Sequence, residues 1–297
     1  QDDDGRIDSG ITSAALTLQR LVETVRVAGG PTYSYADSDF VRDGANGGEP
    51  GGNIRVAFLY DPERVELVAG SLLPLMNPEL QQAAANPFFR SRIPLLATFR
   101  RVDTASSAVG PSDERPFAPS GGDDSDAHPL ELTLINCHFS SKSGSAPLFG
   151  RIQPSVLLQE DPSVNAQVDV RRAQARVVLD FVQSRLRVDP RARIAVLGDF
   201  NELELSSPLA DVLGSALTNL TFRLQRGDRY SFLFEGNAQA LDHVLVSPAL
   251  RPGALYDAVH IHSELAESSL RGSDHDPVIA SFRLALPRRF RWQRLGL

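Results

Sequence analysis

The sequence predicts packed β-sheets with helices outside them, because many short apolar runs suit strands and few helical segments separate them. Helical spacing of apolar residues favours helices over 11–28 and 166–187. With 297 residues, 42% of them hydrophobic, the chain can form one large domain or two modest ones. The strand candidates are 54–60, 65–68, 93–102, 130–139, 194–197, 241–246 and 278–284.

The first third of the chain predicts a helix, a loop and a hairpin. Residues 36–52 are rich in Gly, Asp and Asn and indicate a surface loop. The runs 54–60 and 65–68 flank the turn Asp61-Pro62-Glu63, which predicts a hairpin. The helix over 11–28 ends at a Gly-Gly pair and should bury the row Leu18, Leu21, Val22 and Val25.

The rest of the chain contains a low-complexity insertion, a second helix and a basic tail. Residues 103–129 are mostly Ser, Gly, Asp and Pro, so we expect them to protrude as a mobile loop. Ser207-Pro208 predicts a helix start, and 285–297 is a basic tail. The helix over 166–187 should bury Ala173, Val177, Phe181 and Val182, and leave Arg171, Arg172 and Arg176 as a solvated flank.

The bulk properties exclude several classes of protein. A net charge of −7 and a pI of about 5.4 argue against bulk attraction to nucleic acid, although an enzyme can meet phosphates through a bound cation. No apolar run reaches the roughly 18 residues of a membrane span, and the start has no signal peptide. Cys137 alone allows no internal disulfide, and no feature indicates a protein partner.

Four short segments combine acids, amides and histidines with strand-like runs: Asn136–Phe139, Gly198–Asn201, Leu241–Val244 and Ser273–Asp276. Each alone is explained as well by a strand-end turn or a surface loop. Together they predict one site for a hard metal ion and a phosphate. Oxygen-rich acids without a Cys-rich pattern favour Mg²⁺ over zinc, and no Walker loop, Gly-x-Ser-x-Gly or His-Glu-x-x-His motif is present.

Two of these segments place polar side chains on one strand face, because residues two apart in an extended chain face the same way. Asp199 and Asn201 therefore point together, so the carboxylate can accept a proton from water while the amide donates to developing charge. Asn136 and His138 share a face in the same manner, which turns Cys137 away from them. Lys142 follows in a Ser/Gly loop and is a candidate for neutralising phosphate charge.

The other two segments predict a carboxylate–imidazole pair. Asp242 shares a strand face with two valines, where an unpaired carboxylate is costly. We predict that His275 is its partner and is kept cationic near neutral pH. His243 points the other way, which indicates a structural role. Asp274, beside His275, is the candidate metal carboxylate.

The ordered set Asn-x-His, Gly-Asp-x-Asn, Leu-Asp-His and Ser-Asp-His-Asp-Pro-Val resembles the endonuclease/exonuclease/phosphatase superfamily, and its bacterial secreted nuclease branch in particular. Longer resembling stretches are GGEPGGNIRVAFLYDPERV, FSSKSGSAPLFGRIQP, YSFLFEGNAQALDHVLVSPAL and SDHDPVIASF. The resemblance implies one domain over 1–284 with an α+β, four-layer αββα sandwich of two mostly antiparallel sheets. It also implies an extracellular or cell-surface location.

The resemblance further implies a phosphodiesterase that depends on Mg²⁺ or Mn²⁺ and hydrolyses nucleic acid, with a DNA endonuclease as the leading interpretation. Asp199 would activate the attacking water, Asn201 would position it, and Asp274 would bind metal. His275, paired with Asp242, would contact the scissile phosphate or protonate the leaving oxygen. The remaining candidates are a phosphate contact, His138, and four substrate-binding residues, Asn136, Lys142, Arg55 and Arg92.

One feature departs from the family. Its metal-binding glutamate belongs to a Leu-Gln-Glu segment, and this chain opens at Gln1–Gly5, which resembles the sequence just after that glutamate. We therefore expect a truncated domain without its first strand, an unpaired sheet edge, weak metal binding, and solvent-facing aspartates at 2–4. Two alternatives stay open: a phospholipid or small-molecule phosphoesterase of the same fold, and a catalytically inactive binding module.

Overall fold

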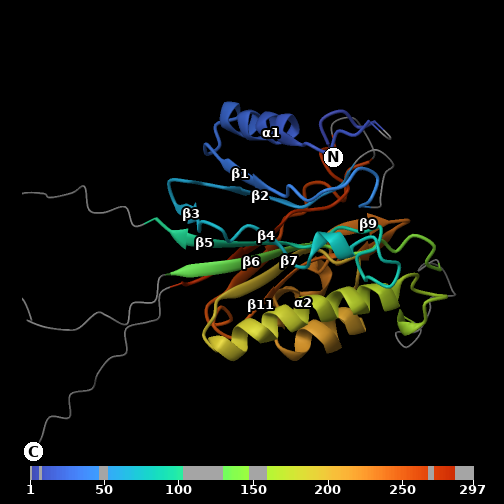
Figure 1. Ribbon diagram of the computed structural model, residues 1–297. Coiled ribbons are helices and arrows are strands. Elements are labelled where there is room, and N and C mark those ends of the chain that lie inside the picture. Colours follow the sequence, from blue (N-terminus) through green and yellow to red (C-terminus); the bar gives the residue numbers. More distant parts are fainter. Residues whose placement is uncertain are drawn as a thin grey trace, which may run out of the picture.

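The computed structural model describes residues 2–6, 9–46, 53–102, 130–146, 159–266 and 271–284, which form stacked layers of sheet and helix (Figure 1). The predicted mobile insertion and the basic tail, 103–129 and 285–297, lie outside the described residues. Within the described ranges, no helix has the length and apolar character needed to cross a membrane.

A seven-stranded sheet forms the centre of the molecule. Neighbouring strands are antiparallel except β6 and β7, which run parallel. Its central strands are short apolar runs, as the sequence predicted, because both of their faces are covered. The strand order is β3 (Val65–Leu67), β5 (Leu95–Arg101), β6 (Glu131–His138), β7 (Ile194–Asp199), β11 (Asp242–Val246) and β8 (Thr218–Asn219), with β4 (Leu73–Pro74) paired to β5.

One face of the central sheet carries a second β layer made of two separate antiparallel pairs. The pair β1 (Ser34–Asp37) and β2 (Ala57–Tyr60) packs over β5, and β12 (Leu255–Ala258) and β13 (Val278–Ser281) pack over β7 and β11. Leu134 of β6 contacts both groups. Among the described residues, β2 and β13 each have one hydrogen-bonded partner strand, so this layer is discontinuous.

Helices cover the outer sides of the β layers. Helix α1 (Ala15–Val27) lies outside β1 and β2, and α2 (Val168–Val188) lies against the free face of the central sheet (Figure 1). The π-helical turn Pro208–Val212, where the sequence predicted a helix start, packs beside α2. The α+β sandwich of packed, mostly antiparallel sheets is therefore confirmed. Short 3-10 turns occupy Pro78–Leu80, Leu213–Ser215, Leu220–Arg223 and Arg226–Asp228.

The predicted hairpin over 54–68 is wrong. Strand β2 pairs with β1, and β3 pairs with β5, so the two runs belong to different sheets. The turn between them is present, since Asp61 O accepts from the amides of Arg64 and Val65, but it carries the chain from one layer to the next. Apolar packing decides this: Phe58 of β2 stacks edge-on against Phe99 of β5 at 5.7 Å.

Three burial predictions also need correction. In α1 only Leu18 of the predicted row is buried, and Leu21 is exposed, because the helix covers just a two-stranded sheet. In α2 the buried side is rotated and includes Arg171, whereas Val177 and Phe181 are half-buried. Asp2 is buried, not solvent-facing, and accepts a 2.8 Å hydrogen bond from Asn53.

Candidate active site

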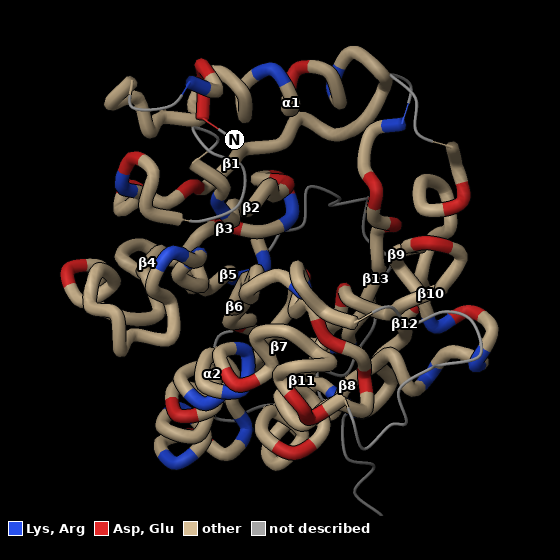
Figure 2. Tube along the Cα trace, turned by 90° about the vertical axis from the view of Figure 1, so that its right-hand side faces the viewer, with Lys and Arg blue, Asp and Glu red and all other residues tan. Residues whose placement is uncertain are grey.

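Three neighbouring strands of the central sheet end in polar side chains that are aligned with one another. His138 of β6 is the register partner of Asp199 of β7, and Asp199 is the partner of Asp242 of β11. Figure 2 shows these strands in succession across the molecule. All three side chains belong to the sheet face that β12 and β13 cover, at its uncovered end, so the topology brings together residues more than 100 positions apart.

The chain reaches Asp199 through a tight approach of two strands. Gly198 has φ of +130°, and a Cβ built there would lie 2.0 Å from Cys137 O, so only glycine fits. Phe200 is fully buried beyond it. Asn201 then adopts a left-handed φ of 51° and returns toward Asp199, with its amide N–H donating to Asp199 Oδ1 at 2.7 Å.

The carboxamide of Asn201 is held in place on both sides. Its Nδ2 lies 3.2 Å from Asp199 Oδ2 and 3.2 Å from Phe139 O. Asn201 therefore fixes the orientation of the Asp199 carboxylate. The predicted convergence of these two side chains is present.

Asp242 and His275, the predicted pair, are in contact. His275 Nδ1 donates to Asp242 Oδ2 at 2.6 Å, and the Ser231 hydroxyl donates to the same oxygen at 2.7 Å. With Nδ1 committed to the carboxylate, Nε2 is the nitrogen left for a substrate. Sequence reasoning missed Ser231; it precedes an alternating strand run, which is too weak a signal to single it out.

The loop before β13 holds His275 through the buried carboxylate of Asp276. Asp276 Oδ1 accepts from the backbone amides of 261, 262 and 263, and Oδ2 accepts from His260 and the Ser263 hydroxyl. These donors hold the pKa of Asp276 below its usual range despite burial. Asp274, on the other side of His275, is exposed and lines the same cavity as His275 and Asn201.

The environment separates the protonation states of these groups. Burial and the neighbouring charge of Asp242 raise the pKa of Asp199 to about 6, against the opposing effect of His275. Burial disfavours the charged form of His275, but the hydrogen bond and charge of Asp242 prevail and raise its pKa to about 9. Burial, with the charges of Arg92 and His275, lowers the pKa of His138 to about 3. At neutral pH, His275 is therefore cationic and His138 neutral.

Some of the predicted substrate contacts lie at the cluster and others do not. Arg92 is buried beside the cluster, donates to Phe139 O at 2.7 Å, and keeps its Nε without a partner in the described structure. His138 Nε2 lies 3.4 Å from Asp199 Oδ2. Asn136 donates across the layers to Ala57 O, and Arg55 pairs with Asp37 at 2.8 Å, so both side chains serve the β1–β2 layer rather than the cluster.

A buried ion pair beneath the cluster was missed from the sequence. Arg171, predicted as solvated, is fully buried and bonds Glu202 at 2.7 Å and the carbonyls of Ser140 and Ser141. Lys142 points inward to Asn165 and lies 3.7 Å from Glu202, and burial lowers its pKa to about 8. The only signal for this pair was an acidic residue directly after Asn201, too common to be decisive.

The side chains at the cluster can be compared with the ligands that Mg²⁺ or Mn²⁺, the metals implied by the resemblance, require. Asp199, Asn201 and Asp274 offer oxygen atoms, which suit Mg²⁺ or Mn²⁺. In the described part of the chain, however, no three His, Cys, Asp or Glu side chains are grouped so as to hold one ion. The oxygen donors are of the kind that such a metal prefers, but too few carboxylates are grouped among the described residues to hold it.

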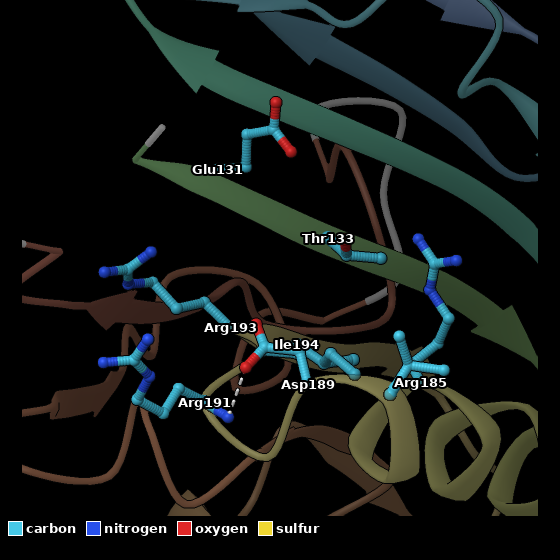
Figure 3. A pocket seen from close by; sticks show the side chains of 9 residues that line it. Glu131, Thr133, Arg185, Asp189, Arg191, Arg193 and Ile194 are labelled. Atoms are coloured by element: carbon cyan, nitrogen blue, oxygen red, sulfur yellow. Dashed lines mark hydrogen bonds between the residues drawn. The ribbon is translucent and has the colours of Figure 1, made fainter. Parts of the chain in front are cut away.

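Two cavities lie at opposite ends of the central strands. One of about 570 Å³ adjoins the cluster and is bounded by Asn201, His275 and the hairpin of β9 (Phe232–Phe234) and β10 (Asn237–Gln239). The other, about 260 Å³, lies where β6 and β7 begin (Figure 3). Its arginines stand apart at the rim, and Glu131 is already paired with Arg100 at 2.6 Å, so it contains no comparable cluster.

Comparisons with known proteins give the fold. No known family and no curated protein matches the sequence. The structure is similar to truncated TDP2 from Caenorhabditis elegans, with a TM-score of 0.50 and 12% identity over 93% of this chain and 81% of that one. The similarity is lower for an endonuclease/exonuclease/phosphatase family protein from Bacteroides thetaiotaomicron (TM-score 0.45, 15% identity, 88% of this chain and 76% of that one) and for the human nocturnin catalytic domain (0.46, 13%, 90% and 75%).

The chain therefore shares a fold with TDP2, an α+β sandwich of the kind that its motifs predicted. At these identities the comparison extends to the fold alone. The substrate and the reaction must be argued from the residues at the ends of β6, β7 and β11.

Proposed function

We propose that this chain is a metal-dependent phosphodiesterase that hydrolyses nucleic acid, with DNA as the leading substrate. The observation that supports this most is the His275–Asp242 contact beside Asp199. A cationic donor and a carboxylate acceptor are then close together where β7 and β11 meet. A divalent cation at Asp274, the candidate metal carboxylate, would neutralise charge on the phosphate.

The protein's own groups suit hydrolysis by water. Asp199 accepts a proton from the attacking water as the new oxygen–phosphorus bond forms, and Asn201 keeps that carboxylate oriented. His275 Nε2–H gives its proton to the leaving oxygen as the old bond breaks, while Asp242 stabilises the imidazolium. The buried guanidinium of Arg92, which interacts with the charge of Asp199, would add positive charge near the phosphate.

The test is nicking of supercoiled plasmid with Mg²⁺ or Mn²⁺, run beside hydrolysis of a phosphodiester lipid in vesicles. We expect the plasmid to be nicked, and His275→Ala to lower the rate by about 100-fold or more. Near-normal nicking by this variant would refute the role of His275. Lipid turnover without nicking would favour the phospholipid alternative.

A binding module without catalysis is the second candidate, and the incomplete grouping of metal donors in the described residues favours it. Calorimetric titration of Mg²⁺ and Mn²⁺ into the protein separates the two. A stoichiometric site that Asp274→Asn weakens supports the enzyme, and the absence of a specific site supports the module. The extracellular location and the single-domain boundary at 284 stay predictions.

A further inference from the structure

The hairpin beside the cluster presents one face of aromatic and amide side chains to the 570 Å³ cavity. Phe232 and Phe234 are two apart on β9, and their rings are nearly parallel, at 10° with centroids 6.1 Å apart. On β10, Gln239 is the register partner of Phe232, and Asn237 is the partner of Phe234. All four line the cavity, so a row of rings lies beside a row of amides.

The aromatic row continues to the reactive histidine. The Phe232 ring lies 4.7 Å from the His275 ring, and the two residues form a backbone bridge. Phe234, the next aromatic residue on β9, is 54% exposed and lines the same cavity, so its ring is open to a ligand. A group resting on Phe234 would be adjacent to a phosphate at His275 and Asn201, which line the same cavity.

The amide row retains unused hydrogen-bonding capacity. Gln239 is 7% exposed, yet its carboxamide makes no hydrogen bond to any described residue. Asn237 makes only long contacts, 3.4 and 3.3 Å, to hairpin carbonyls, and its side-chain oxygen is not engaged among the described residues. The Gln239 amide faces the open cavity and is not among the buried atoms that lack a partner, so both amides can pair with a ligand that has donors and acceptors on its edge.

The segment 141–146 also lines the cavity. It contributes Ser, Gly and Ala side chains, and its one long residue, Lys142, directs its ammonium to Asn165 instead. Small side chains in the lining, together with the aromatic row, leave room for a flat group.

We propose that this cavity, defined by Phe232, Phe234, Asn237 and Gln239, binds the nucleobase next to the scissile phosphate. An aromatic face with polar atoms at its edge matches a base, whereas an acyl chain would leave the Gln239 amide unpaired. This inference rests on the proposed function, since it assigns the substrate class of the same site.

The experiment compares a short single-stranded DNA with its fully abasic tetrahydrofuran analogue, which keeps every phosphate. Binding is measured by fluorescence anisotropy with EDTA, so that no strand is cut. The native protein should bind the base-containing strand about 10-fold more tightly, the effect of one stacked base. Phe234→Ala should abolish this preference and Phe234→Trp should keep it. Gln239→Leu should reduce it.

Phe222→Ala is the matched control, because Phe222 is 43% exposed and lies outside the cavity. It should keep the full preference. Equal binding of the two strands by the native protein, a preference that survives Phe234→Ala, or no measurable binding of either strand would each overturn the inference. Hydrolysis of bis(p-nitrophenyl) phosphate, assayed separately with Mg²⁺ or Mn²⁺, tests the proposed function, so either claim can fail without the other.

Discussion

The carboxylate of Asp199, a candidate catalytic residue, lowers the stability of the fold. It lies in a buried position next to the charge of Asp242, and its pKa rises from 3.8 to about 6 as a result. Between these values the folded carboxyl keeps a proton that the unfolded chain has released. Stability therefore falls as the pH rises through this window, and above it the full destabilisation is present.

Asp199→Asn should consequently stabilise the metal-free protein. The expected gain in unfolding free energy is on the order of 2 kcal/mol at pH 8 and close to zero at pH 4. Urea denaturation in EDTA at both pH values measures it. Asp180→Asn, an exposed acid on α2, is the control and should have little effect at either pH. A loss of stability in Asp199→Asn at pH 8 would contradict this assignment.

The site residues could be predicted from the sequence to the extent that they follow strand periodicity. Asp199 and Asp242 were predicted because each lies at the end of an apolar strand run that fixes its face. The contact of Asn201 depends on its left-handed turn and that of His275 on the loop before β13, and strand periodicity reports neither. The contacts of Ser231 and of Arg171 could not be found in this way. A serine is too common to carry a signal, and an arginine buried in a helix looks solvated until its partner is located.

At the scale of the elements, the contact between β6 and β7 depends on Gly198. A methyl group there would overlap Cys137 O, and the positive φ would add strain. Gly198→Ala should therefore lower the unfolding free energy by about 3 kcal/mol or prevent soluble expression. Gly227→Ala, where a Cβ meets nothing within 4 Å, should be neutral. Equal denaturation midpoints for the two variants would refute this account of the strand approach.

The ion pair of Arg171 and Glu202 fastens α2 to the loop after β7. Both side chains are fully buried, so Glu202→Ala leaves an uncompensated guanidinium and should cost about 3 kcal/mol of unfolding free energy. The double variant Arg171→Met with Glu202→Leu should recover much of that loss, since both charges of the pair are then removed and Lys142, whose pKa burial already lowers, can become neutral. Chemical denaturation followed by circular dichroism tests this, and a single variant within about 1 kcal/mol of the native protein would contradict it.

Strand pairing was the least predictable feature at this scale. The run 54–60 was recognised as a strand, but its partner is β1, which lies in a segment rich in loop-forming residues. The choice between β1 and β3 depends on the apolar contacts of Phe58 across the layers, and local turn chemistry does not report those.

At the scale of the whole molecule, the two β layers differ in continuity. The central sheet is covered on both faces, whereas the second layer, in the part of the chain that the structure describes, is divided into β1–β2 and β12–β13. Two-stranded pairs are marginal alone, so their amides should exchange faster than those of β6, β7 and β11. Hydrogen–deuterium exchange with mass spectrometry checks this order, and equal protection in both layers would contradict it.

The central claim is that the aligned ends of β6, β7 and β11, with His275, form a phosphodiester-hydrolysing site. The most direct measurement is the initial rate on bis(p-nitrophenyl) phosphate with saturating Mg²⁺ or Mn²⁺. We expect hydrolysis by the native protein and by Asp180→Asn, and losses of about 100-fold or more in Asp199→Asn and His275→Ala. Equal rates in all four proteins, or no hydrolysis by the native protein with either metal, would contradict the claim.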